Sequence, residues 1–261
     1  MSNNSIELNI EGHVAYIALN RPEVFNSFNR EMALKLQNIM DDCASDDTVR
    51  AMVITGNGKA FCAGQDLKEV TTPELNPGFK KILEEHYNPI ITKIREIKKP
   101  IIAAVNGVAA GAGANIALAC DIVIAKSSVS FIQAFSLIGL IPDSAGTYIL
   151  PRLVGYQKAT ALAMLGDKVS ANDAEQMGMI YKSVEEEDFQ STVEKIATKL
   201  SLMPTKALGM TKTLLNASMA NTLEQQLAME SEYQIEAAQS EDYAEGVAAF
   251  IEKRKPNFTG K

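Results

Sequence analysis

The chain has 261 residues, of which 46% are hydrophobic, and its formal net charge is −7 at pH 7. That length suits one large domain, or one domain with an appendage, and the hydrophobic content supports a large core. The acidic balance argues against nucleic acid as the main partner. No membrane-spanning segment is expected either, because charged residues, Gly or Pro interrupt every apolar run.

Three cysteines, Cys43, Cys62 and Cys120, are an odd number and lack the spacing of metal ligands. They fit a reducing cytoplasm better than a disulfide scaffold. The first residues also lack the basic and apolar pattern of a secretion signal. We therefore expect a cytoplasmic protein with no metal site.

Strand and helix patterns alternate over the first 200 residues. In chain order they predict a hairpin (6–10 and 14–19), a helix (28–43), a strand (51–55), a helix (79–98), a strand (100–105), a helix (113–120), two short strands (122–125 and 129–131) and helices (150–165, 171–177 and 188–200). This order is typical of an α/β protein, and its strand-strand-helix repetition suggests stacked turns.

No strand pattern follows Pro204. Helices are expected over 206–219, 222–240 and 242–255. Ser240 is placed to cap the last of them, and Pro256 to stop it. The sequence thus predicts an α/β core over residues 1–200 and a helical region over 201–261.

Two glycine-rich turns follow apolar strands, within AMVITGNGKAFCAGQDL (51–67) and PIIAAVNGVAAGAGANIALACDIVIA (100–125). Small residues allow a ligand to approach the backbone and leave N–H groups bare. Two such turns could direct two N–H donors at one oxygen, which is the geometry of an oxyanion hole. The alternatives are tight strand-to-helix packing and a phosphate-binding loop. The second lacks both the third glycine of a dinucleotide motif and a Walker lysine.

A single carboxylate, Asp143, lies in the apolar stretch GLIPDSAG. It could cap a helix or turn, which is the commonest role of Asp before small residues. It could instead be a general acid/base whose proton affinity is raised by burial. The residues alone favour the cap. By the same reasoning Asp66 braces the first turn, Lys253 is a solvated helix-end cation, and His86 and Tyr87 pack their helix.

Four segments together resemble the enoyl-CoA hydratase/isomerase (crotonase) family over nearly the whole chain: LNRPEVFNSFN (19–29), GKAFCAGQDL (58–67), KKPIIAAVNGVAAGAGANIALACDIVIA (98–125) and FIEKRKPNF (250–258). The resemblance implies a spiral of ββα turns with a C-terminal α-helical trimerisation region. It also implies a homotrimer, or a hexamer made as a dimer of trimers. The implied ligand is an acyl-CoA substrate, so coenzyme A arrives as part of the substrate and no separate cofactor is expected.

The resemblance also implies roles for individual residues. The thioester oxygen would lie between the backbone N–H groups of Gln65 and Ala112. The terminal helix would reach the CoA, often in the neighbouring subunit. The implied CoA-binding residues are Val24, Ala60, Ala63, Gln65, Asp66, Leu67, Phe250 and Lys253.

Both glutamates of the family's hydratases are missing, because Asn115 and Phe135 stand in their places. Instead, Asp143 in IGLIPDSAGT resembles the pattern of the family's single-carboxylate isomerases, apart from Ala145, where a glycine is common. The most similar isomerases convert ring-1,2-epoxyphenylacetyl-CoA to oxepin-CoA in phenylacetate catabolism. The resemblance implies that reaction and a 3-enoyl to 2-enoyl-CoA shift, with Asp143 as acid/base. Another crotonase reaction such as hydration, or a non-catalytic CoA-binding assembly protein, are the alternatives.

Overall fold

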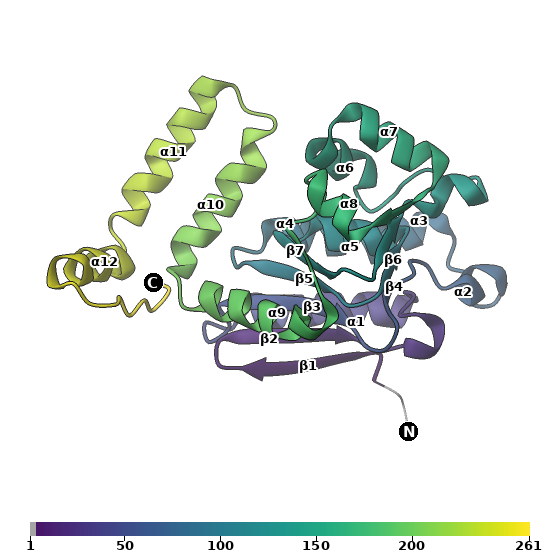
Figure 1. The fold of residues 1–261 in the computed structure, drawn as a ribbon, viewed down its shortest axis with the longest axis horizontal. Coiled ribbons are helices and arrows are strands. Elements are labelled where there is room, and N and C mark those ends of the chain that lie inside the picture. The colour runs from purple at the N-terminus through teal and green to yellow at the C-terminus, as the bar shows by residue number, and fades with distance from the viewer. Residues whose placement is uncertain (1–3) are drawn as a thin grey trace.

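Two β-sheets organise residues 4–261, the part of the chain that this computed structural model describes (Figure 1). The six-stranded sheet has the order β1 (Ile6–Glu11), β2 (Val14–Leu19), β3 (Ala51–Gly56), β5 (Ile101–Val105), β7 (Ile122–Lys126) and β10 (Lys182–Val184). The four-stranded sheet has the order β4 (Ala60–Cys62), β6 (Val108–Ala110), β8 (Ser130–Ile132) and β9 (Lys168–Ser170). The strand β1 pairs antiparallel with β2, and β9 pairs antiparallel with β8. The other neighbouring strands of both sheets pair in parallel.

Successive strand pairs build both sheets turn by turn. The strands β3, β5 and β7 enter the six-stranded sheet, and the strand that follows each of them enters the four-stranded sheet. Helical segments then return the chain to the next turn. This arrangement confirms the predicted spiral of ββα turns. The strands β4, β6, β9 and β10 escaped the prediction, since three residues show too little alternation to be recognised.

Most predicted helices are present, with shifted ends. Those of the spiral are α1 (Arg30–Ser45), α2 (Leu67–Thr71), α3 (Phe79–Lys81), α4 (Asn88–Glu96), α5 (Ala112–Ala119), α6 (Gly146–Val154), α7 (Tyr156–Leu165), α8 (Ala171–Gln176) and α9 (Glu186–Ser201), with the short segments η1 (Pro22–Val24), η2 (Ile82–Tyr87) and η3 (Ala134–Ile138). The single helix predicted over 150–165 is wrong, because Gly155 adopts a φ of 77° that ends α6 before α7 begins.

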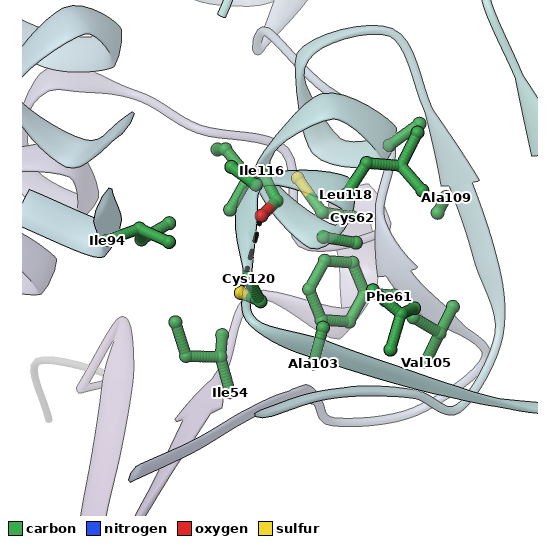
Figure 2. Packing of buried hydrophobic residues seen from close by; sticks show 14 of the residues in the cluster. Ile54, Phe61, Cys62, Ile94, Ala103, Val105, Ala109, Ile116, Leu118 and Cys120 are labelled. Atoms are coloured by element: carbon green, nitrogen blue, oxygen red, sulfur yellow. Dashed lines mark hydrogen bonds between the residues drawn. The ribbon is translucent and has the colours of Figure 1, made fainter. Parts of the chain in front are cut away.

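The core lies on both faces of the six-stranded sheet. Alternate residues of β3 separate the two clusters: Met52 and Ile54 join the larger one, whereas Val53 packs with Phe189 and Val193 of α9. The larger cluster continues between the two sheets and α5, where side chains of β4, β5 and α5 interdigitate (Figure 2). A Cβ atom on Gly113 would lie 2.3 Å from the carbonyl oxygen of Cys62, so α5 can lie this close to β4 only with glycine there.

The C-terminal helices α10 (Thr205–Ser218), α11 (Leu223–Ala237) and α12 (Glu241–Glu252) extend away from the sheets (Figure 1). Ser240 caps α12 as predicted, because its side chain accepts a hydrogen bond from the Tyr243 N–H. The helix stops three residues before the predicted end, at a left-handed Lys253. Among the helices of residues 4–261, none is long and apolar enough to cross a membrane.

Candidate functional site

A cavity of about 780 Å³ brings the two glycine-rich turns and the Asp143 turn together. Gly64 and Gln65 come from the first turn, and Gly111 and Ala112 from the second. The rest of the lining is mostly apolar: Val24, Phe25, Leu67, Val70, Phe79, Ile82, Ala134, Phe135, Ile138 and Leu140. A mostly apolar cavity with a small number of polar groups is typical of a site for a small molecule.

The N–H groups of Gln65 and Ala112 are both free to bind a ligand. The backbone of Phe28 accepts the Asp66 N–H (2.9 Å) and donates to the Gly64 carbonyl (2.7 Å), so it holds the loop on both sides of Gln65. Within residues 4–261 the Gln65 N–H itself donates to no protein group. Ala112 is the first residue of α5, so its N–H has no acceptor within the helix.

The two turns that carry these donors touch each other. Gly64 has a φ of 91°, and a Cβ atom on it would lie 3.5 Å from the Ala112 nitrogen. A side chain at this position would therefore be strained, and it would lie close to the Ala110 carbonyl oxygen, at 3.2 Å. The arrangement fits the predicted pair of donors for one oxygen.

The Asp143 carboxyl group is half-buried at the wall of the same cavity. Burial raises the pKa of Asp143 above its usual value, and a hydrogen bond from the Ser144 hydroxyl, 2.9 Å away, partly opposes that effect. The interpretation of Asp143 as an N-cap is wrong. The helix α6 begins at Gly146, and its N-cap residue, Ala145, provides no side-chain hydrogen bond.

Asn115 holds the backbone of the Asp143 turn. Its Nδ2 donates to the Asp143 carbonyl oxygen (2.8 Å), and its Oδ1 accepts from Gln133 Nε2 (2.7 Å). Asn115 is 1% exposed and Gln133 4% exposed, so both bonds are shielded from water. The Asn115 amide thus supports the turn that carries the Asp143 carboxylate.

The turn after Asp143 is strained. Ser144 and Ala145 have φ values of 49° and 59°, which place two successive side-chain-bearing residues in the left-handed region. That conformation costs about 1–2 kcal/mol for each such residue. Ala145 stands where the sequence comparison expects glycine, and its backbone angles explain that preference.

Asp66 braces the first turn, as the sequence indicates. Its carboxylate accepts the Lys68 N–H (2.9 Å) and so caps α2, and it forms an ion pair with Arg21 (2.8 Å). Tyr87, by contrast, was predicted only to pack. Its ring is 1% exposed, it lines the cavity, and its hydroxyl donates to Gln65 Oε1 (2.9 Å). The one sequence signal for this role was Pro89, which follows it inside a helical pattern.

The other predicted site residues divide into two groups. Val24, Ala63 and Leu67 line the cavity with Gln65 and Asp66. The ones outside the cavity lining are Ala60, Phe250 and Lys253. Ala60 is 1% exposed within β4, whereas Phe250 and Lys253 lie at the end of α12, remote from the cavity of their own chain (Figure 1). Their contact with CoA in a neighbouring subunit stays a prediction.

The wall near Asp143 differs in part from the expectation. The apolar residues that precede Asp143, over 131–140, would suit a wall for an aromatic ring, but Phe131 is buried in the core and Leu137 is turned to the surface. Phe135, Ile138 and Leu140 do line the cavity. Within residues 4–261, no cluster of His, Cys, Asp and Glu is arranged to hold a metal ion.

Comparisons with known proteins identify the family and the fold. The model of the family "Enoyl-CoA hydratase/isomerase" matches residues 9–261. The chain is 46% identical to 1,2-epoxyphenylacetyl-CoA isomerase of Escherichia coli over 97% of both chains, and 43% identical to a protein of Rhodobacter capsulatus named "probable enoyl-CoA hydratase" over the full length of both. The crystal structure of an enoyl-CoA hydratase from Bacillus anthracis superposes with a TM-score of 0.92 at 31% identity, covering 99% of this chain and 100% of that one.

The strained turn predicts a stabilising substitution. Ala145→Gly should raise the free energy of unfolding by about 0.5–1 kcal/mol, because relief of the left-handed conformation exceeds the entropy that glycine adds to the unfolded chain. The matched control is Ala161→Gly in the exposed face of α7, which should lower it by about 1 kcal/mol. Urea unfolding at equal protein concentration measures both. Equal destabilisation by the two substitutions would contradict the strain.

Proposed function

The chain belongs to the enoyl-CoA hydratase/isomerase family, and we propose that it is a cytoplasmic acyl-CoA isomerase that converts ring-1,2-epoxyphenylacetyl-CoA to oxepin-CoA. It would also shift the double bond of 3-enoyl-CoA to the 2-position. The observation that carries the proposal is Asp143, which lines a mostly apolar cavity together with two free N–H donors, whereas the other lining carboxylate, Asp66, is held in an ion pair with Arg21. The named activity of the Escherichia coli relative supports the choice of substrate.

In this mechanism the thioester carbonyl oxygen accepts hydrogen bonds from the N–H groups of Gln65 and Ala112. Both donors are in place before the substrate binds, so they stabilise negative charge that develops on the oxygen without reorganisation. A lost donor of this kind typically costs about 3–4 kcal/mol of barrier. The apolar lining strengthens the effect by excluding water.

Asp143 would act as the proton carrier. In the double-bond shift its carboxylate takes a proton from C2 of the 3-enoyl group, and the charge moves onto the thioester oxygen. The same carboxyl group then returns the proton to C4, which gives the 2-enoyl product with no net change in atoms. With the epoxide, the bond shared by the two epoxide carbons breaks as the ring expands, and Asp143 would assist that opening.

The cavity favours isomerisation over hydration. Neither product contains an added water, and an activated water would consume a reactive epoxide. Phe135 lines the cavity where hydratases of the family carry a glutamate, and Asn115 uses its amide to hold the Asp143 turn. The acid/base pair that would add water is therefore replaced by an aromatic side chain and a support.

Replacing the proposed base, Asp143, should strongly reduce turnover while leaving the fold intact. Asp143→Asn should lower kcat by about 2–4 decades, the range typical of general acid–base catalysis, with little change in acyl-CoA affinity. Asp47→Asn, a change at an exposed site remote from the cavity, is the control. Near-normal turnover by Asp143→Asn would refute the assignment.

The pH profile provides a second check on the base. The mechanism needs Asp143 ionised, and burial raises the pKa of this carboxyl group. The kcat should therefore fall, as the pH is lowered, at a higher pH than an exposed aspartate with a pKa of about 3.9 would cause. Steady-state kinetics across the acidic range, with circular dichroism to exclude unfolding, would record it. A profile flat down to the pKa of an ordinary aspartate would contradict the role.

Substrate preference separates the two main candidate reactions. Ring-1,2-epoxyphenylacetyl-CoA and a 3-enoyl-CoA should both be isomerised, whereas crotonyl-CoA should be hydrated only weakly. Side-by-side kcat/KM values for the three thioesters test this. Crotonyl-CoA hydration with the highest kcat/KM would favour the hydratase reading that the name of the Rhodobacter capsulatus relative suggests.

We also propose that the C-terminal helices assemble the chain into a trimer or a dimer of trimers. Phe250 and Ile251 are 85% and 73% exposed, more apolar surface than a free helix should show. A variant ending at Ser240 should lose both assembly and acyl-CoA affinity, because a neighbour's α12 completes the site. Sedimentation velocity and a CoA titration measure the two effects. A monomeric full-length protein would contradict the assembly.

A further inference from the structure

The side chain of Gln65 is held at both of its polar atoms. Its Oε1 accepts from the Tyr87 hydroxyl (2.9 Å), and its Nε2 donates to Glu69 Oε2 (2.7 Å). Glu69 is itself 8% exposed, and its second oxygen accepts the Arg30 N–H (2.7 Å). A residue expected to act only through its backbone thus has a side chain in a buried polar network.

The ring of Tyr87 packs against Phe28, the residue whose backbone holds the Gln65 loop. The rings of Tyr87 and Phe28 meet edge to face, with centroids 6.1 Å apart. The backbone of Phe28 holds the loop at Gly64 and Asp66. One buried tyrosine therefore supports the Gln65 N–H from two directions, by a hydrogen bond to its side chain and by packing against its backbone clamp.

The position of Tyr87 follows from Pro89. Proline inside a helix lacks an N–H and displaces the carbonyl four residues earlier, here that of Glu85. The chain responds with the π-helical segment η2, which ends at Tyr87. The freed Glu85 carbonyl accepts a hydrogen bond from Gln37 Nε2 at 2.8 Å, so this carbonyl has a partner outside its own helix. Such π-helical turns often mark functional sites.

We infer that Tyr87 is a positioning residue for the oxyanion site: it fixes the Gln65 side chain and thereby directs the Gln65 N–H into the cavity. This inference rests on the proposed thioester chemistry. It also gives the Gln65 side chain a role, because removing it leaves the peptide that carries the donor held only by the backbone of Phe28. Tyr87 needs no contact with the substrate in this role, since its hydroxyl proton is already donated to Gln65.

A double-mutant cycle tests the inference. Tyr87→Phe and Gln65→Met each remove the hydrogen bond with little change in volume, and each should lower kcat about 10- to 100-fold, less than complete loss of an oxyanion donor. The KM should change by no more than about threefold, as expected when only transition-state binding is lost. Because both variants lose the Tyr87–Gln65 bond, the double variant should match Gln65→Met, which also loses the bond to Glu69. Tyr16→Phe, at a half-buried tyrosine of β2, is the control.

A spectroscopic measurement separates this role from a general loss of structure or activity. A cinnamoyl-type thioester of CoA absorbs at longer wavelength when its carbonyl is polarised, so it reports the donors without turnover. Tyr87→Phe and Gln65→Met should both reduce the shift of the bound thioester, with affinity retained.

Multiplied losses in the double variant would overturn the inference and make Tyr87 a substrate contact. A thioester shift unchanged by Tyr87→Phe would also overturn it. If the native protein itself caused no shift, the proposed function would fail, and this inference with it.

Discussion

The close contact between successive turns of the spiral is the constraint on which the site depends. Successive turns of the spiral add neighbouring parallel strands to both sheets, so the loop after β4 lies in contact with the start of α5. At Gly113 the approach leaves room for a hydrogen atom but for no side chain, and at Gly64 a Cβ atom would lie 3.2 Å from the Ala110 carbonyl oxygen. Two backbone N–H groups thereby come to one cavity without any side chain being assigned to the task.

Burial decides what the few polar groups in the cavity can do. The lining is apolar, so a charge that forms there is poorly solvated unless a fixed dipole faces it. The N–H groups of Gln65 and Ala112 provide such dipoles for an oxygen, and the same burial raises the pKa of Asp143. In the proposed mechanism, one environment would thus favour negative charge on the substrate oxygen and bring the Asp143 carboxyl group nearer to exchanging its proton.

Much of the fold could be predicted from the sequence, because its signals are local. The hairpin, the buried strands β3 and β5, the glycine-rich turns and the cap of α12 each depend on neighbouring residues. The three-residue strands could not be predicted, since pairing with distant strands defines them. The break at Gly155 was missed because the residues on both sides have good helical patterns.

The site shows the same division between local and distant information. The glycine-rich turns are visible in the sequence, whereas the resemblance to the family was needed to assign the donors to Gln65 and Ala112. Asp143 was open to two interpretations, because capping depends on where α6 begins, and that is set by the left-handed turn after it. The role of Tyr87 was hidden, since its partner lies 22 residues earlier in the chain.

The short helix α5 couples the two halves of the chemistry. Its first residue, Ala112, offers an N–H to the cavity, and Asn115, three residues later, lies on the same side of the helix and holds the Asp143 carbonyl. In the proposed mechanism, a shift of α5 would therefore move the oxyanion donor and the proton carrier together. The resemblance to the family implies that hydratases carry a glutamate at the position of Asn115. On that basis, an amide in its place removes one acid and anchors the turn that carries another, so one residue on a short helix would bear on the choice of reaction while the proposed oxyanion site is retained.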